Sequence, residues 1–233
     1  MARRQARNPQ LRDRDWEILE HVARYRMTTP DVLHRLFWEN DDGRTAVTKV
    51  TSRLTDYGFL NRYDFIHPKS YFVLGPNGTK AFGIPQKRSN ALGPQSLCSE
   101  HGVLAYCCLR EERQERLTVR ELQEFNPAYL QKGVESSPYY LHTVDGRTSL
   151  TFIRVDGGGS VDHVVRKCKR DYQQRAKVPA FRELVDQGRF AIAVVTGMVP
   201  QDAKVKEVEE ALARQNLPIR FFVASVPDLV ELW

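Results

Sequence analysis

The sequence predicts an α+β fold built from two domains, and three observations support this prediction. With 233 residues, the chain is long for one average domain and has room for two small ones. Residues 1–90 contain three segments with helical periodicity followed by two β-like segments, whereas residues 91–233 mix strand and helix patterns. A stretch rich in Gly, Pro, Asn and Ser, residues 75–93, separates the two patterns. We therefore expect a basic arm at 1–12, a first domain at 13–85, a linker at 86–95 and a second domain at 96–233.

The excess positive charge lies entirely in the first part of the chain. Residues 1–90 contain 16 Lys and Arg against 10 Asp and Glu, whereas residues 91–233 contain 19 of each. Positive charge concentrated in one half of a chain is typical of proteins that bind a polyanion. The alternative is a basic surface that serves only solubility. The hydrophobic content of 41% excludes a wholly disordered chain.

Several other classes of protein are also disfavoured. The longest apolar run, Val103–Leu109, is too short to span a membrane, and Met1–Gln10 lacks the apolar centre of a secretory signal. The cysteines form no C-x-x-C pair and have no histidine partners at zinc-finger spacing; they are Cys98, Cys107, Cys108 and Cys168. We therefore expect reduced thiols in a cytoplasmic protein without a membrane partner.

The first domain begins with three expected helices. Apolar residues recur at helical spacing over Asp13–Tyr25. A second helix starts at Pro30, where Thr29 can cap it, and residues 40–43 form a turn. A third helix covers Arg44–Tyr57 and stops at Gly58.

Two β-like segments, Leu60–Phe65 and Ser70–Leu74, then form a hairpin around His67, Pro68 and Lys69. Three helices followed by a hairpin, in about 65 residues, is the order of elements in a winged helix-turn-helix, a fold that binds DNA.

The third helix has the side chains that a DNA-recognition helix needs. Val47, Val50 and Leu54 fall on one face, and the remaining surface is short, polar and basic, without an acidic residue before Asp56. Lys and Arg can donate to guanine or phosphate, and Ser and Thr can contact bases or backbone. We expect double-stranded DNA to contact Arg44, Thr45, Thr48, Lys49, Ser52 and Arg53 of the helix, and Arg62, His67 and Lys69 of the wing. We also expect a homodimer that matches two half-sites. The alternative for this face is an ordinary solvated surface.

The second domain should combine strands and helices in the order β-β-β-α-(α)-β-α-β after a first helix. The expected elements are a helix at Ser96–Glu112; strands at Leu117–Leu122, Tyr139–Val144 and Ser149–Val155, the last two joined by the turn Asp145-Gly146; helices at Val161–Ala176 and Pro179–Gln187; a strand at Phe190–Thr196; a helix at Gln201–Gln215; a strand at Ile219–Ala224; and a final helical turn at Pro227–Leu232. His101, Cys107 and Cys108 are expected to be core residues of the first of these helices.

A run of glycines links a strand to a basic helix in this domain. Gly157, Gly158, Gly159 and Ser160 resemble a phosphate cradle at a helix N-terminus, but they match neither the dinucleotide-binding pattern nor a P-loop. A flexible turn is the alternative. The helix that follows carries Arg166, Lys167, Lys169, Arg170, Arg175 and Lys177.

The order of elements also matches the core of the restriction-endonuclease-like fold, whose carboxylates hold Mg²⁺. The corresponding positions here are Pro138-Tyr139 and Arg154-Val155-Asp156, and only Asp156 is acidic. A tyrosine and an arginine cannot replace hard oxygen ligands. We therefore expect a nuclease-like scaffold that is catalytically degenerate, with no metal, cofactor or catalytic residue.

An enzymatic interpretation remains open as an alternative. A Mg²⁺-dependent endonuclease or nickase could use an unconventional site around Asp156, Asp162 and Lys167. Nicking by Tyr139 or Tyr140 would also require a histidine cluster, which spacing does not provide.

Taken with its motifs, the sequence resembles the replication-relaxation family of bacterial plasmids and integrative elements. The segments that carry the resemblance are Arg14–Leu19, Thr45–Leu60, Tyr71–Gly78, His101, Phe152–Gly157 and the helix containing Lys167 and Tyr172, so that it spans about 12 to 200. The resemblance implies DNA binding by the winged helix and a role in plasmid replication, mobilisation or element regulation. It also implies a nuclease-like second domain, often with Pro-Asp and Glu-x-Asp motifs, from which this sequence departs at Tyr139 and Arg154.

The sequence therefore predicts a sequence-specific DNA-binding protein of a mobile genetic element. It would act as a transcriptional regulator or as an accessory factor, together with mobilisation or replication proteins. A protein–protein adaptor whose basic half is incidental is a further alternative.

Overall fold

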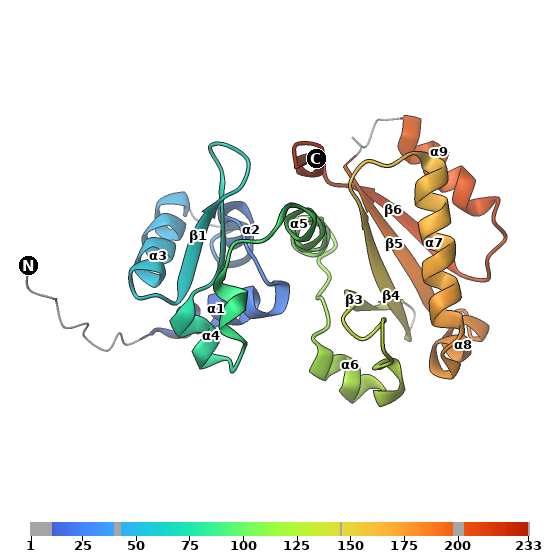
Figure 1. Cartoon of the computed structure of the whole chain (residues 1–233), viewed down its shortest axis with the longest axis horizontal. Helices are drawn as coiled ribbons and strands as arrows, with labels where there is room; N and C mark the ends of the chain where they lie inside the picture. Colours follow the sequence, from blue (N-terminus) through green and yellow to red (C-terminus); the bar gives the residue numbers. More distant parts are fainter. Residues whose placement is uncertain (1–10, 40–42, 145, 198–202, 233) are drawn as a thin grey trace, which may run out of the picture. The chain divides into compact units, whose positions relative to one another are not determined.

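The computed structural model describes residues 11–39, 43–144, 146–197 and 203–232 and shows a mixed α and β protein (Figure 1). The chain divides into two compact units, residues 1–93 (unit 1) and 94–233 (unit 2). Several predicted features lie outside the described residues: Arg3, Arg4 and Arg7 of the arm, the turn at 40–42, Asp145 of the hairpin and the start of the helix expected at Gln201. In the part of the chain that is described, no helix has the length and apolar character needed to cross a membrane.

Unit 1 has the predicted order of three helices and a hairpin. Its elements are α1 (Asp13–Tyr25), α2 (Pro30–Phe37), α3 (Arg44–Asp56), β1 (Leu60–Asp64), β2 (Ser70–Leu74), α4 (Pro76–Ala81) and the 3-10 helix η1 (Gln86–Ser89). Pro30 occupies the first turn of α2, and Thr29 Oγ1 accepts a hydrogen bond from the Val32 N–H at 3.4 Å, as its sequence predicts. Gly58 ends the turn after α3 with φ +70°, a conformation that favours glycine.

The three helices and the hairpin enclose one hydrophobic core. Ile18, Leu19 and Val22 of α1 pack with residues of α2, α3 and both strands, including Leu33, Leu54, Leu60 and Phe72. β1 and β2 are antiparallel, with Leu60 opposite Leu74 and Asp64 opposite Ser70. Thr28, between α1 and α2, exchanges two backbone hydrogen bonds of 2.9 Å with Phe72, which adds a short third segment to the sheet.

Unit 2 contains a four-stranded sheet in the order β3-β4-β5-β6. Its strands are β3 (Tyr139–Val144), β4 (Arg147–Asp156), β5 (Phe190–Thr196) and β6 (Arg220–Ser225), with β3–β4 antiparallel and the other two pairs parallel. Its helices are α5 (Pro94–Cys108), α6 (Val119–Phe125), α7 (Val161–Ala176), α8 (Pro179–Asp186) and α9 (Ala203–Ala213), and its 3-10 helices are η2 (Pro127–Tyr129) and η3 (Pro227–Leu229).

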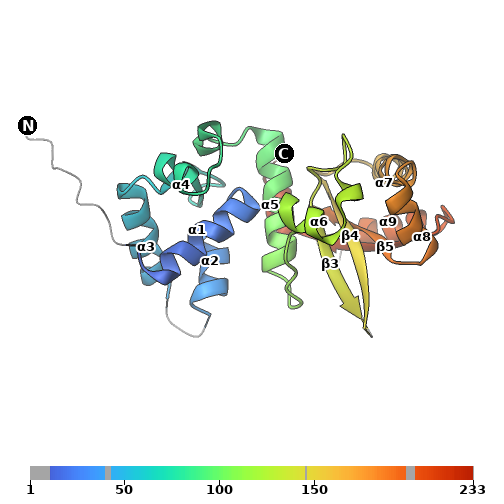
Figure 2. The same cartoon turned by 90° about the horizontal axis from the view of Figure 1, so that it is seen from below.

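Helices cover both faces of this sheet. α5 lies on one face, and α7 and α9 lie on the other (Figures 1 and 2). The α7 side holds the main core of the unit, in which Val164 and Cys168 pack with Phe152, Phe190, Ile192 and Val194. On the α5 side, Gly102 approaches Val155 of β4 closely enough that a Cβ atom on residue 102 would lie 2.6 Å from Val155 Cγ1.

One predicted strand is wrong. Residues 117–122 were expected to be extended, but most of them belong to the helix α6. Thr118 and Glu121 form a capping box, in which Thr118 Oγ1 accepts from the Glu121 N–H at 3.2 Å and Glu121 Oε2 accepts from the Thr118 N–H at 2.7 Å. The backbone pairs with the sheet before the helix begins, at Arg116 through a bridge to Tyr140 and at Leu117 through a 2.7 Å hydrogen bond to the Tyr139 carbonyl. A strong helix start therefore overrides the alternating pattern after one bridge.

Candidate nucleic-acid interface

The α3 helix presents a polar and basic face to solvent. Val47, Thr51 and Leu54 are buried on its inner side. Five of the six predicted contact residues on α3 are exposed: Arg44, Thr45, Thr48, Lys49 and Ser52. Among the described residues, neither Arg44 nor Lys49 takes part in an ion pair. Thr48 Oγ1 donates to the Arg44 carbonyl at 3.1 Å, so its oxygen retains capacity to accept a hydrogen bond.

Arg53, the sixth predicted contact, is held inside unit 1. Its Nη2 and Nη1 donate to the two carboxylate oxygens of Asp15 at 2.6 and 3.0 Å. The Asp15 side chain is 2% exposed and that of Arg53 is 31% exposed. The hydrogen bond to Asp15 raises the pKa of Arg53. In the structure Arg53 fastens α3 to α1, a partnership between residues 38 positions apart that no local pattern indicates.

The predicted wing residues lie on the β1–β2 hairpin. Arg62, His67 and Lys69 are exposed, and Arg62 Nε donates to Ser70 Oγ at 2.9 Å across the hairpin. Because a short turn reverses the chain between α3 and β1, the start of α3 and the hairpin loop lie at the same end of unit 1 (Figure 1). The hairpin also carries one exposed acid, Asp64.

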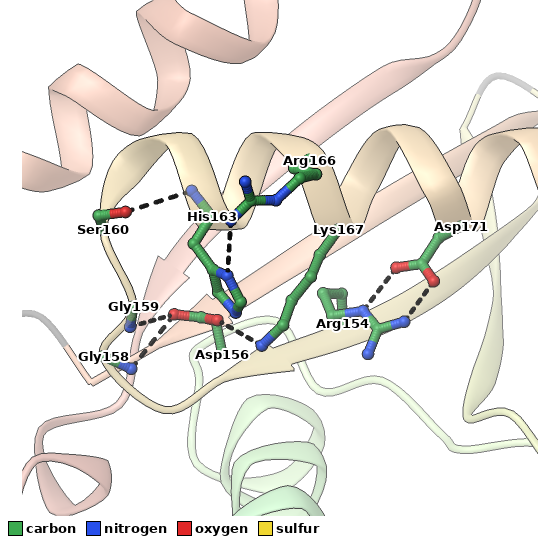
Figure 3. A network of polar contacts seen from close by, with 9 residues as sticks. All are labelled: Arg154, Asp156, Gly158, Gly159, Ser160, His163, Arg166, Lys167 and Asp171. Carbon is green, nitrogen blue, oxygen red and sulfur yellow. Dashed lines mark hydrogen bonds and ion pairs between the residues drawn. The ribbon is translucent and has the colours of Figure 1, made fainter.

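The glycine run of unit 2 surrounds a carboxylate of its own chain. Asp156 ends β4 and is 1% exposed. Its Oδ2 accepts from the N–H groups of Gly158 and Gly159 at 3.2 and 2.9 Å, and its Oδ1 accepts from Lys167 Nζ at 3.1 Å (Figure 3). The N–H groups of Gly158 and Gly159 are therefore already satisfied, so the expectation of a phosphate cradle is wrong for them. Ser160 completes the junction by accepting the His163 N–H at 3.3 Å and capping α7.

The two positions that carry carboxylates in nuclease-like cores have structural partners here. Arg154 binds Asp171 through two hydrogen bonds, one of them from Nε at 2.6 Å (Figure 3). Tyr139 is fully buried, and its hydroxyl accepts from Arg175 Nε at 2.9 Å. The Arg175 guanidinium also lies 3.6 Å from the centre of the Phe152 ring. These contacts connect β3 and β4 to α7.

The residues named in the enzymatic alternative are only partly brought together. Asp156 and Lys167 form an ion pair, but Asp162 is exposed in the first turn of α7. Over the described ranges, no three His, Cys, Asp or Glu side chains are arranged to hold a metal ion. Tyr139 and Tyr140 lie in the interior, and burial raises the pKa of both phenols. The histidine and the adjacent cysteines of α5 are core residues, as predicted: His101, Cys107 and Cys108 are buried.

No protein-family model and no curated protein matches this chain. The residues themselves therefore carry the functional argument.

Sequence reasoning also missed a cationic hollow in unit 2. Three arginines and a histidine line it, and they come from positions between 142 and 220. Only the pairing of β3, β4, β5 and β6 brings these positions together, so no local motif marks them.

Proposed function

We propose that this protein binds double-stranded DNA in a sequence-specific manner through unit 1, acting as a winged helix-turn-helix. The observation that carries the proposal is the exposed face of α3, on which five polar or basic side chains lie together over residues 44–52 without an acid. In this arrangement α3 enters the major groove, and Arg62, His67 and Lys69 contact the adjacent phosphates.

The chemistry of this face suits base edges as well as phosphates. Arg and Lys donate to the O6 and N7 atoms of guanine, and Ser and Thr hydroxyls contact bases or phosphate oxygens. The ion pair between Arg53 and Asp15 supports α3 from behind, so that the other five side chains are presented on a fixed helix.

For unit 2 we propose a nuclease-like scaffold that has lost its metal site. A paired arginine at position 154 and a buried tyrosine at position 139 support this proposal. The whole chain would act as a transcriptional regulator or as an accessory factor in mobilisation or replication of a mobile element. A homodimer would place two copies of α3 on half-sites one helical turn apart.

The test begins with selection of bound duplexes from a random DNA library by the full-length protein. Binding of the selected duplex is then titrated by fluorescence anisotropy at about 50 and 200 mM salt, with random DNA as competitor. We expect one sequence to be enriched and its affinity to fall steeply with salt, because contacts to phosphates release counterions.

Lys49→Ala identifies the surface involved. We expect it to weaken binding of the selected duplex by about tenfold and to reduce the salt slope by about 0.9 if the contact is to phosphate. Lys206→Ala is the matched control, because Lys206 is an exposed lysine on α9 of unit 2. Equal losses in the two variants would contradict the assignment of α3. An absence of DNA binding at low salt would instead favour the adaptor alternative.

A further inference from the structure

The α5-facing side of the unit 2 sheet contains a cationic hollow of about 610 Å³. It is lined by His142, Arg147, Ser149, Thr151, Arg189, Arg220 and Phe222, together with Gln187 and Gly188. We propose that this hollow, which we call the arginine pocket, binds a nucleoside phosphate.

Strand pairing explains how the arginine pocket forms. His142 of β3 lies opposite Ser149 of β4, and Thr151 of β4 and Arg220 of β6 lie on either side of Ala191. Directly paired residues point to the same face of a sheet, so these side chains share one surface. The central strand β5 contributes only the methyl group of Ala191 at this level, which leaves space between the side chains of β4 and β6.

The pocket lies on a part of the sheet that α5 leaves uncovered. α5 packs against β4 where Gly102 meets Val155 and against β3 where the Tyr106 and Tyr140 hydroxyls lie 3.0 Å apart, and no residue of α5 lines the pocket. Figure 2 shows the β3–β4 hairpin continuing beyond the level of α5. Since side chains alternate along a strand, the pocket residues Ser149 and Thr151 point away from the face that carries Arg154 and Asp156. The arginine pocket is therefore separate from the network in Figure 3.

The charge of the pocket favours an anion. Its three arginines come from the start of β4, the turn before β5 and the start of β6, and among the residues that the structure describes no acidic side chain lines it. Within the described residues, their hydrogen bonds go to neutral oxygens: Arg189 donates to the Thr148 carbonyl at 2.7 Å and to Gln187 Oε1 at 3.0 Å, and Arg220 donates weakly to Ser149 Oγ at 3.4 Å. Like charges gathered without a counter-charge repel one another, and a phosphate would relieve that repulsion through the guanidinium fork.

Two aromatic rings, those of His142 and Phe222, line the hollow beside the arginines and can contact a base. His142 and Phe222 stack with centroids 6.3 Å apart and an interplanar angle of 29°. Ring faces of this kind stack on nucleobases whatever their sequence. The volume lies within the range of small-molecule sites and greatly exceeds the space that a single phosphate ion fills. Charge, rings and size together indicate a phosphate ester that carries a base.

The first experiment measures binding of small probes to the full-length protein by isothermal titration calorimetry. The probes are dAMP, deoxyadenosine and inorganic phosphate. We expect dAMP to bind at least tenfold more tightly than either of the other two, because only dAMP offers both the phosphate and the base. If neither dAMP nor the oligonucleotide described below binds, the proposal is overturned. If inorganic phosphate binds as tightly as dAMP, the proposed contact between the rings and the base is overturned.

Variants locate the binding site. Arg147→Ala and Arg220→Ala should each weaken dAMP binding by about tenfold or more, the size of one lost charge-assisted contact. Phe222→Leu should weaken dAMP binding and leave phosphate binding unchanged. Arg214→Ala is the control, because Arg214 is an exposed arginine that follows α9 and lies outside the pocket. Unchanged binding in the double variant Arg147→Ala/Arg220→Ala would contradict the assignment.

A second set of probes distinguishes a nucleic-acid strand from a free mononucleotide as the source of the bound phosphate. A single-stranded oligo-dA with a 5′ phosphate is compared with the same strand without it, both in the Lys49→Ala background. Binding of this strand that depends on Arg147 and Arg220 indicates a nucleic-acid strand as the source, and binding of free dAMP alone indicates a mononucleotide. Because Lys49 lies in unit 1, the proposal about the arginine pocket can succeed or fail independently of the proposed function.

Discussion

At the scale of single residues, unit 1 depends on a few polar groups placed in its interior. Asp15 accepts two hydrogen bonds from Arg53 and a third from the Arg12 N–H at 2.9 Å. A buried carboxylate is stable only when such donors replace the water that it has lost. Asp15 therefore couples the start of α1 to the last turn of α3.

Removing the charge of Asp15 should destabilise unit 1. We expect Asp15→Asn to lower the free energy of unfolding by about 1–3 kcal/mol, because Arg53 loses its ionised partner while remaining half-buried. Urea denaturation followed by tryptophan fluorescence measures this loss, since Trp16 and Trp38 belong to unit 1. Asp13→Asn is the control: Asp13 is exposed two residues before Asp15, and its change should remain within about 0.5 kcal/mol. Equal effects would show that the Asp15 contacts contribute no net stability.

His21 should make unit 1 sensitive to acid. Burial, together with the nearby positive charge of Arg24, lowers the pKa of His21 from 6.5 to about 4. The folded state therefore resists protonation, so this contribution is complete above pH 6.5 and is lost as the pH falls towards 4. At 1.36 kcal/mol per pKa unit, a lowering from 6.5 to about 4 corresponds to a loss of about 3 kcal/mol by pH 4.

Urea denaturation at pH 7 and pH 4 tests this prediction. The difference in unfolding free energy between the two pH values should be about 3 kcal/mol smaller in His21→Gln than in the unmodified protein. His67→Gln, at an exposed position in the hairpin loop, should leave the difference unchanged. If the unfolding free energy of His21→Gln depends on pH as strongly as that of the unmodified protein, other titratable groups cause the acid sensitivity.

At the scale of elements, helical and strand periodicity predicted most of the fold. α1, β2, β3, α7 and β5 begin and end at the predicted residues, because each has a clear pattern and a clear stop signal. The strand predicted at 117–122 was wrong, since the capping box of Thr118 and Glu121 starts a helix there. The predicted face of α3 was correct in exposure except for Arg53, whose partner lies 38 residues away. Contacts of that range follow from packing and cannot be deduced from local spacing.

The approach of α5 to β4 gives a prediction at the same scale. Gly102→Ala would place a Cβ atom 2.6 Å from Cγ1 and 2.8 Å from Cγ2 of Val155, and valine has little rotamer freedom with which to move away. We expect a loss of about 1–3 kcal/mol in the stability of unit 2, measured by thermal or urea unfolding. Val155→Ala should partly restore stability in the Gly102→Ala background. Gly93→Ala is the control, because a Cβ atom at residue 93 meets no atom within 4 Å and stability should not change. Unchanged stability in Gly102→Ala would show that α5 and β4 can move apart without a loss of stability.

At the scale of the whole molecule, each unit contains a hydrophobic core cluster of its own. The core cluster of unit 1 is drawn from residues 11–84 and that of unit 2 from residues 117–223, with no residue in common. A compact unit with its own core is expected to fold by itself.

A fragment of residues 1–93 should therefore fold and bind the duplex selected by the full chain. We expect its NMR amide spectrum to be dispersed and its salt slope to match that of the full-length protein, since the proposed contacts all lie in unit 1. The complementary fragment, residues 94–233, should bind dAMP but not the duplex. Poorly dispersed amide signals from the fragment 1–93 would mean that unit 1 requires unit 2 for stability.

The clamp between Asp15 and Arg53 has a consequence for the kinetics of encounter. A recognition helix that swings or folds during binding makes association wait for a conformational step, and such complexes form slowly. Here two hydrogen bonds hold the last turn of α3 on α1 in the absence of a partner, so the complex that we propose would need no ordering of α3 between collision and docking. The rate of association would then be set by diffusion and by the attraction between the basic unit and its partner, and differences between DNA sequences would be expressed in how long each complex lasts.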